Sequence, residues 1–293
     1  MTETLPPLPE VLAGRYRIER LLGAGGMGLV YRARDLLHEQ MGAPDASIAV
    51  KLLSDVFAAS PDASSLLYSE FVLTQHLRHP GVVQVFDFAI EPANQRAFIT
   101  MELMRGLPLD RLLCERPLGV PWIELRDIAI ELLDALAHAH SRGVLHGDLK
   151  PSNVMLTEDG LRLFDFGLGQ AVNGVLAGLP KLRRETLNAW TPSYAAPELL
   201  EGGALSLRTD MFAVACVLFE LAGGKHPFQR LSGIEAREQK LDRGLNCPKH
   251  LPTTCWPAVK NALALKPQKR TIDARALRDI FREAPPARSW RWF

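Results

Sequence analysis

The sequence predicts an α+β chain with a small β-rich N-terminal unit, which has one main helix, and a larger α-helical C-terminal unit. Three observations support this fold class. The 293 residues are enough for two cores. Short apolar stretches separated by glycine turns continue to about residue 103. Beyond Gly106 the apolar residues recur with the spacing of a helix instead.

The N-terminal unit is expected over residues 15–104, after a loose leader at residues 1–14. A linker at residues 35–46 contains Gly42 and Pro44. The spacing becomes helical between residues 61 and 77, and Pro80 and Gly81 end the helix. Apolar alternation predicts five strands, at residues 16–22, 29–33, 47–53, 82–88 and 97–103.

The C-terminal unit is expected over residues 105–284, with helices at residues 122–142, 210–222 and 274–283. The segment between Phe166 and Pro197 lacks periodicity and is interpreted as a long functional loop. Residues 285–293 form a tail rich in arginine and tryptophan. We expect this tail to pack back onto the domain, and docking to a partner or a membrane surface is the alternative.

Composition restricts the classes of partner. The net charge of +1 provides no overall field to attract nucleic acid or an anionic membrane, so no nucleic acid partner is expected. The first ten residues lack the pattern of a signal peptide, and no apolar stretch is long enough for a transmembrane anchor. The four cysteines have no paired spacing, which indicates free thiols and a cytoplasmic location. A zinc site at Cys247, His250 and Cys255 is the less favoured alternative.

Glycines at positions 23, 25, 26 and 28 fit the pattern G-x-G-x-x-G-x-V between two predicted strands. Without side chains, the backbone N–H groups of such a loop can lie close over a triphosphate. A dinucleotide-binding fold uses a similar pattern, but there a helix follows the glycines. A plain glycine-rich hairpin is the structural alternative.

Three motifs in the second half of the chain carry the chemistry. They are His146–Asn153, Asp165–Gly167 and Ala196–Glu198, and they provide a proton acceptor, an amine and two oxygen ligands for a metal. With Lys51 in a predicted buried strand, these motifs resemble the eukaryotic-like (Hanks-type) serine/threonine protein kinases of bacteria over residues 16–281. The resemblance implies a bilobal protein-kinase-like fold, with ATP and Mg²⁺ as cofactors.

The resemblance also implies a role for each motif residue. Asp148 would accept or orient the proton of the substrate hydroxyl, and Lys150 would balance the charge on the transferred group. Lys51 would hold the α- and β-phosphates, and Glu70 would hold Lys51. The magnesium ligands would be Asn153 and Asp165. The nucleotide site would comprise Gly23, Ala24, Gly25, Gly26, Met27, Gly28, Val30, Ala49, Lys51, and the hinge residues Glu102 and Met104.

Other residues match a protein kinase scaffold. Arg270 is positioned to pair with Glu198, and Asp210 to brace the catalytic loop. Thr191 belongs to a substrate-side loop that favours aliphatic hydroxyl acceptors, where Trp190 replaces a common glycine. These residues weigh against the resemblance to small-molecule phosphotransferases, such as the aminoglycoside and choline kinases.

Gly147 departs from the family pattern, which has arginine before the catalytic aspartate. That arginine normally pairs with a phosphorylated residue of the activation loop. We therefore expect activity that does not depend on loop phosphorylation, although Thr186 is a candidate autophosphorylation site. The predicted function is phosphoryl transfer to serine and threonine hydroxyls of protein substrates in signalling, by a chain that forms a homodimer. A pseudokinase scaffold is the alternative from another class.

Overall fold

The computed structural model describes residues 8–24, 28–53, 63–172, 175–176, 178–179 and 191–285. The described chain divides into two compact units. The N-terminal unit contains the residues up to Arg78 and those from Val83 to Arg105. The C-terminal unit contains His79–Val82, Gly106–Val175 and the chain from Thr191 onward. The chain passes from the first unit to the second after Arg105, and the short segment 79–82 also belongs to the second unit.

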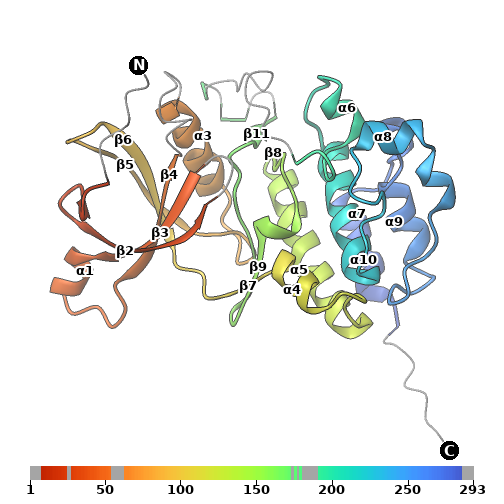
Figure 1. Cartoon of the computed structure of the whole chain (residues 1–293), viewed down its shortest axis with the longest axis horizontal. Coiled ribbons are helices and arrows are strands. Elements are labelled where there is room, and N and C mark those ends of the chain that lie inside the picture. The colour runs from red at the N-terminus through yellow and green to blue at the C-terminus, as the bar shows by residue number, and fades with distance from the viewer. Residues whose placement is uncertain are drawn as a thin grey trace, which may run out of the picture. The chain divides into compact units, whose positions relative to one another are not determined.

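The N-terminal unit is a six-stranded antiparallel sheet with one long helix (Figure 1). The helix α3 (Ala63–His76) packs against β5 and β6. A cluster of buried apolar side chains on β4, among them Ile48, Val50 and Leu52, forms a core with Phe98. The strands lie in the order β1 (Val11–Leu12), β2 (Tyr16–Ala24), β3 (Gly28–Asp35), β4 (Ser47–Leu53), β6 (Arg96–Glu102) and β5 (Val85–Glu91).

Two elements of this unit were not predicted. Within the expected leader, β1 pairs Leu12 with Tyr16, and Leu12 is fully buried in the sheet core. The expectation of a loose segment was therefore wrong for residues 8–14, because two residues are too short a stretch to show strand alternation. The linker contains the short helix α1 (Leu36–Gln40). Its N-cap is Asp35, whose carboxylate accepts the N–H groups of residues 37 and 38.

The C-terminal unit is mainly helical, and the strands of its small sheets β7–β9–β10 and β8–β11 flank the motif segments 146–153 and 165–167 (Figure 1). The helix α7 is almost wholly buried and packs against α5 and α9. The elements in chain order are β7 (Gly106–Pro108), α4 (Leu109–Glu115), α5 (Trp122–Ser141), β8 (Val144–Leu145), η1 (Pro151–Asn153), β9 (Val154–Thr157), β10 (Gly160–Leu163), β11 (Gln170–Ala171), α6 (Pro197–Leu200), α7 (Leu207–Gly223), α8 (Gly233–Glu238), η3 (Leu241–Gly244), α9 (Trp256–Ala262), η4 (Pro267–Lys269) and α10 (Ala274–Glu283).

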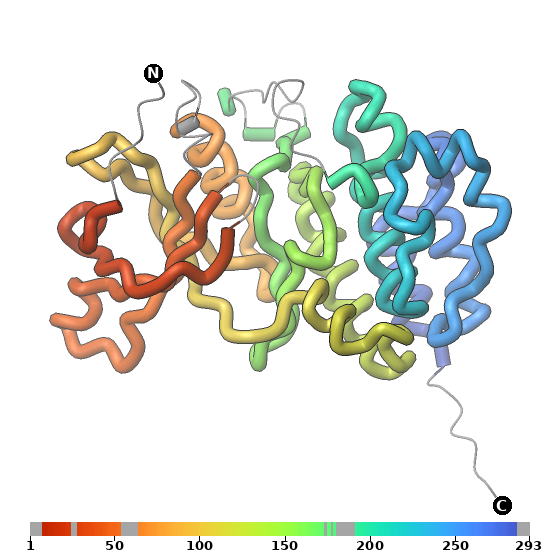
Figure 2. The backbone as a smooth tube through the Cα atoms, viewed as in Figure 1, coloured from red at the N-terminus to blue at the C-terminus, as the bar shows by residue number. Residues whose placement is uncertain are grey.

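Both ends of α7 are defined by local chemistry. Ser206 and Thr209 form a capping box at its start, which satisfies the first backbone N–H groups. At its end, Gly224 adopts a left-handed conformation with φ of 70°. A Cβ atom at Gly224 would lie 2.1 Å from the carbonyl oxygen of Pro117, so only glycine fits there. Figure 2 traces the same backbone as a tube, in which the helices are coils and the colour runs from red at the N-terminus to blue at the C-terminus.

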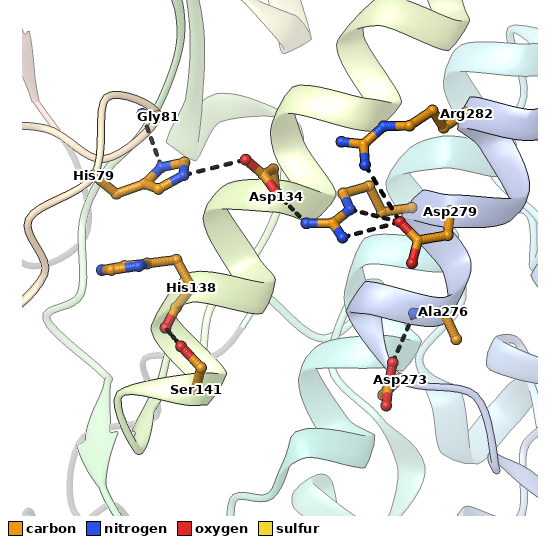
Figure 3. Close-up of polar contacts among 10 residues, drawn as sticks. His79, Gly81, Asp134, His138, Ser141, Asp273, Ala276, Asp279 and Arg282 are labelled. Atoms are coloured by element: carbon orange, nitrogen blue, oxygen red, sulfur yellow. Dashed lines mark hydrogen bonds and ion pairs between the residues drawn. The ribbon is translucent and has the colours of Figure 1, made fainter.

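The segment His79–Val82 is attached to α5 through His79 (Figure 3) and to β10 through the backbone of Gly81 and Val82. The ring of His79 accepts the N–H of Gly81 at Nδ1, and its Nε2 lies 3.3 Å from a carboxylate oxygen of Asp134 on α5. Asp134 also binds Arg278 of α10. The segment ends at Val82, which bridges to Leu163 two residues before Asp165. One polar network therefore joins α5, α10 and the segment after the helix that bears Glu70.

No helix in the described part of the chain is long and apolar enough to span a membrane. All four cysteines are free thiols, and only Cys114 is exposed. In the described ranges, no group of three or more histidine, cysteine, aspartate or glutamate side chains is arranged to hold a metal ion. Near the less favoured zinc site, the thiol of Cys247 instead contacts the carbonyl oxygen of Leu251 at 3.3 Å.

Candidate active site

A buried ion pair lies at the centre of the N-terminal unit. Lys51 stands on β4, between β3 and β6, and its Nζ donates to both carboxylate oxygens of Glu70 on α3, at 2.6 and 2.7 Å. Both residues are less than one-tenth exposed. Because an unpaired ammonium would be costly to bury, this pair explains how a lysine can stand in a central strand.

The glycine-rich segment joins β2 to β3, and β3 is the strand that pairs with the strand of Lys51. Gly23 and Ala24 end β2, and Gly28 opens β3; Gly25, Gly26 and Met27 lie outside the described residues. A Cβ atom at Gly28 would lie 2.5 Å from the carbonyl oxygen of Leu52, so a side chain there would force β3 and β4 apart. Gly23 meets no such obstacle within 4 Å.

Two apolar residues share the face of the sheet that carries Lys51. Val30 is the direct cross-strand partner of Lys51, and Ala49 precedes it by two positions in the same strand. Directly paired residues and residues two apart in a strand point to one side of a sheet. Ala49 is buried and Val30 is half-buried, so both can form an apolar surface beside the ammonium group.

The expected hinge follows β6. Glu102 ends this strand, and Met104 stands two residues later, half-buried and outside regular secondary structure. The carboxylate of Glu102 accepts the N–H of Gln84 at 2.8 Å, and its own N–H donates to the carbonyl of Gln84 at 2.9 Å. These two bonds fix the backbone at the start of the hinge.

The catalytic loop of the C-terminal unit places three polar groups in contact. Nζ of Lys150 donates to Oδ2 of Asp148 at 2.5 Å and to the hydroxyl of Thr191 at 2.9 Å. Lys150 therefore joins the catalytic loop to the start of the predicted substrate-side loop. Asn153 donates its amide to the carbonyl oxygen of Asp148 at 2.8 Å, which holds the backbone of the loop in a tight turn.

Asn153 and Asp165 fit a magnesium ion by the chemistry of their donors. The amide nitrogen of Asn153 donates to Asp148, so its amide oxygen is the atom that can bind a cation. The carbonyl of Asn153 accepts the N–H of Phe164, which ties this residue to the one before Asp165. Asp165 adopts a left-handed conformation with φ of 67°, a strain typical of functional positions. A carboxylate and an amide oxygen are hard ligands of the kind that Mg²⁺ prefers.

Asp210 supports the catalytic loop from inside α7. Its carboxylate accepts the N–H groups of His146 and Gly147, each at 2.9 Å, and lies 2.9 Å from Nε2 of His140. Burial by itself raises the pKa of Asp210, but the contact with His140 and the backbone hydrogen bonds outweigh burial, so the pKa lies below its ordinary value. The ionised carboxylate thereby fixes the backbone just before Asp148.

His146 is a buried neutral ring in the same loop. Burial lowers the pKa of His146, and the charges of Asp210, Asp148 and Asp165 offset this only in part. Its Nδ1 accepts the N–H of Asp148 at 3.2 Å, and its Nε2 donates to the carbonyl of Phe164 at 3.1 Å. This single ring therefore links the loop that holds Asp148 to the residue before Asp165.

Gly147 has a structural reason to be glycine. Its φ is +84°, and a Cβ atom would lie 2.5 Å from the carbonyl oxygen of Leu168 and 3.1 Å from the side chain of Leu205. A larger residue such as arginine would have to displace the turn at Leu168. The departure from the family pattern is thus built into the backbone.

A second ion pair, between a buried arginine and a half-buried glutamate, holds the segment after the substrate-side loop. Arg270 is almost fully buried and binds both carboxylate oxygens of Glu198, at 2.6 and 2.8 Å. It also donates to the carbonyls of Ala264 and Arg208 and lies over the ring of Phe212. The pairing of Arg270 with Glu198 is the one that the sequence resemblance implied.

The candidate residues form one set in each unit. Lys51, Glu70, Glu102 and Met104 lie in the N-terminal unit, whereas Asp148, Lys150, Asn153, Asp165 and Thr191 lie in the C-terminal unit. Thr186 and Trp190 lie outside the described residues. Sequence reasoning missed His140, which is 70 positions from Asp210, and it missed the contacts among Tyr194, Glu220 and Arg230. The only local signal for Glu220 was a charge inside an apolar helix.

Comparison with known proteins agrees with this geometry. The family described as the protein kinase domain matches residues 16–281. The DNA damage-responsive serine/threonine-protein kinase RqkA of Deinococcus radiodurans is 36% identical over 87% of this chain, which covers 36% of that relative. The serine/threonine-protein kinase PknA of Mycobacterium tuberculosis is 32% identical over 89% of this chain and 58% of that relative. The chain thus spans about a third to three-fifths of the length of these two curated relatives.

The crystal structure of the PknI kinase domain of Mycobacterium tuberculosis has a TM-score of 0.68 and 27% identity, and it covers 94% of this chain and 99% of that domain. These findings confirm the α+β protein kinase fold and the likeness to Hanks-type kinases of bacteria. The ordered motifs, the braced catalytic loop and the match over residues 16–281 show that the chain belongs to the protein kinase domain family.

Proposed function

We propose that the chain is an active serine/threonine protein kinase, which transfers the γ-phosphoryl group of Mg-ATP to hydroxyl groups of protein substrates. The observation that carries this proposal is the contact of Lys150 with both Asp148 and Thr191. This contact supports a site for the substrate hydroxyl at which the carboxylate of Asp148 and the ammonium group of Lys150 act together. The relatives named as serine/threonine-protein kinases support the same activity.

Asp148 is the proposed proton acceptor. Its carboxylate would take the proton of the serine or threonine hydroxyl as the oxygen attacks, and Lys150 would neutralise negative charge at the same place. When Mg-ATP is bound, ATP would supply the phosphoryl group and Mg²⁺ would neutralise charge on the phosphates. The braced backbone at Gly147 keeps the Asp148 carboxylate positioned without further rearrangement.

The remaining roles follow from the geometry of each group. Lys51, oriented by Glu70, would hold the α- and β-phosphates, and the backbone of the glycine-rich segment would cover the triphosphate. The hinge would bind adenine through the carbonyl of Glu102 and the N–H of Met104. Asn153 and Asp165 would hold Mg²⁺ through their oxygen atoms.

We further propose that activity does not require phosphorylation of the activation loop. The described part of the chain after Phe166 is held by backbone pairing, since β11 pairs with β8 and Val172 donates to the carbonyl of Gly143. Gly147 offers no cation to a loop phosphate. A fully dephosphorylated sample is therefore expected to be active, and an inert sample that regains activity on phosphorylation would contradict this.

The four free thiols support a reducing compartment such as the cytoplasm. The proposed homodimer has a direct test in the molar mass of the purified chain in solution, measured by light scattering.

The deciding experiment compares the wild type with Asp148→Asn in the transfer of labelled γ-phosphate from Mg-ATP to a generic basic protein. We expect kcat to fall about 10²- to 10⁴-fold, while nucleotide affinity measured by calorimetry is kept. Asp159→Asn is the matched control, because Asp159 is exposed in the turn between β9 and β10. Equal loss of ATP binding would show that Asp148 has another role. ATP binding without label on protein would favour a small-molecule acceptor or a pseudokinase.

A further inference from the structure

A buried carboxylate and an exposed arginine form an ion pair beside the predicted acceptor position. Glu220 lies on α7 with its side chain 3% exposed, whereas the side chain of Arg230 is 61% exposed. Nη2 of Arg230 donates to Oε1 of Glu220 at 2.5 Å, and Nη1 lies 3.4 Å from the hydroxyl of Tyr194. Tyr194 donates its hydroxyl to the second oxygen of Glu220. The guanidinium therefore covers the carboxylate on its solvent side.

This cluster is connected to the acceptor position by a single turn of backbone. The N–H groups of Tyr194 and Ala195 both donate to the carbonyl of Thr191, whose hydroxyl contacts Lys150. A narrow cavity is lined by Asp148 together with Tyr194. Since neighbouring residues of an extended peptide are about 3.5 Å apart, side chains only a few positions from a bound serine or threonine can reach this cluster.

The loop that bears Arg230 is strained in a way that positions this side chain. Gln229 and Arg230 both have positive φ angles, of 53° and 61°, although neither is glycine. The buried ring of His226 accepts the N–H groups of Phe228 and Arg230 at its Nδ1 and so fixes the loop. Backbone strain of this kind persists where the surrounding structure requires it, and it gathers at functional sites.

The charges of Glu220 and Arg230 determine which substrate side chains can bind at this cluster. Both carboxylate oxygens of Glu220 accept hydrogen bonds from groups of this chain, so a basic side chain of a substrate would have to compete with Arg230 for them. Arg230 has five N–H donors, of which two take part in the contacts to Glu220 and Tyr194. Its exposed edge can therefore donate to a carboxylate.

We propose that Arg230 is a specificity-determining residue of the acceptor site, which makes the enzyme select segments with acidic side chains near the acceptor and discriminate against basic ones. This inference rests on the protein kinase activity proposed above. Its physical basis is that the exposed positive charge of Arg230 attracts acidic side chains of the substrate. The same guanidinium occupies the carboxylate of Glu220, which basic side chains of the substrate would otherwise bind.

The test uses two matched disordered acceptor polypeptides, each with one threonine flanked by either aspartates or lysines, and measures kcat/KM for both. The wild type is expected to favour the acidic acceptor at least about threefold. Arg230→Gln, which keeps a hydrogen-bond donor but removes the charge, is expected to reduce this ratio to about one or to reverse it, because Glu220 then carries an unneutralised charge. Arg230→Lys is expected to retain the acidic preference.

Arg237→Gln is the matched control, because Arg237 is a half-exposed arginine on α8 that pairs with Glu201. It is expected to leave the ratio unchanged. A wild type that uses both acceptors equally, or an Arg230→Gln ratio equal to that of the wild type, would overturn the inference. Lack of transfer to both polypeptides, to casein and to a basic protein would instead overturn the proposed kinase activity. Thermal unfolding of each variant confirms that the ratios come from folded protein.

Discussion

At the scale of single residues, each buried charge in the site is placed by a partner of this chain. Lys51 has Glu70, Arg270 has Glu198, and Asp210 has His140 together with two backbone N–H groups. Removing one partner of such a pair leaves the other buried and uncompensated, which costs about 3 to 5 kcal/mol. These positions are therefore constrained by stability as well as by chemistry.

Gly147→Ala is expected to destabilise the C-terminal unit by about 2 to 4 kcal/mol, because it adds strain at positive φ to a clash with the carbonyl oxygen of Leu168. Its kcat is expected to fall as well, since the N–H of Gly147 bonds to Asp210 immediately before Asp148. Urea unfolding followed by tryptophan fluorescence gives the free energy of unfolding, and initial rates of transfer give kcat.

Gly244→Ala provides the matched control. No atom lies within 4 Å of its Cβ position, and its φ is not positive. This variant is expected to change stability by less than about 1 kcal/mol. Equal stability of the two variants would show that the approach of Gly147 to Leu168 is not a constraint in solution.

At the scale of elements, an element is predicted correctly when its own residues carry a recognisable pattern, and it is missed when it is very short or depends on residues far away in the sequence. The bounds of β4 and α10 coincide with the predicted ranges 47–53 and 274–283. Each element is long enough for its sequence pattern to be recognised over its whole length. The two-residue strand β1 and the five-residue helix α1 are too short to show a period. The attachment of His79–Val82 to the second unit depends on partners such as Asp134, 55 positions away, which no local pattern reveals.

The site follows the same rule. Asp148, Lys150 and Asn153 lie within six positions of one another, so their spacing alone predicts their chemistry. His140 and Arg230 act through residues reached only by folding, and neither belongs to a motif. Gly147 was visible as a departure from the pattern, but its physical reason needed the position of Leu168.

The packing of α10 on α5 provides a prediction about elements. Leu277 of α10 is fully buried, whereas Arg278 pairs with Asp134, whose side chain is 39% exposed. We expect Leu277→Ala to lower the free energy of unfolding by about 3 kcal/mol and Arg278→Ala by only about 1 kcal/mol. Urea unfolding at low salt, followed by tryptophan fluorescence, measures both.

Salt separates the two causes. Screening weakens an ion pair that is partly exposed but leaves apolar burial unaffected, so the cost of Arg278→Ala is expected to shrink in about 1 M salt while that of Leu277→Ala persists. Two variants with equal costs at both salt concentrations would contradict this division between apolar packing and charge.

At the scale of the whole molecule, buried titratable groups determine how stability depends on pH. The pKa values of Asp35, Asp134 and Asp210 are lowered in the folded chain: burial opposes the shift, but contacts with arginine or histidine outweigh it. Such carboxylates add stability above their ordinary pKa near 4, and this is lost only at lower pH. His146 and His226 affect stability in a different pH range. Burial lowers the pKa of both rings from 6.5, and that of His226 falls to about 4.

Below pH 6.5 the unfolded chain takes up a proton at these two histidines, whereas the folded chain does not, so stability must fall as the pH is lowered from 7 to 5. For His226 the loss over this range is about 2 kcal/mol, and the carboxylates contribute little because they remain ionised in both states. His226→Asn keeps an acceptor for the N–H groups of Phe228 and Arg230 but does not titrate. We expect this variant to lose about 2 kcal/mol less than the wild type between pH 7 and 5, measured by urea unfolding with tryptophan fluorescence. Parallel curves for the two proteins would show that burial does not hold the ring of His226 neutral over this range.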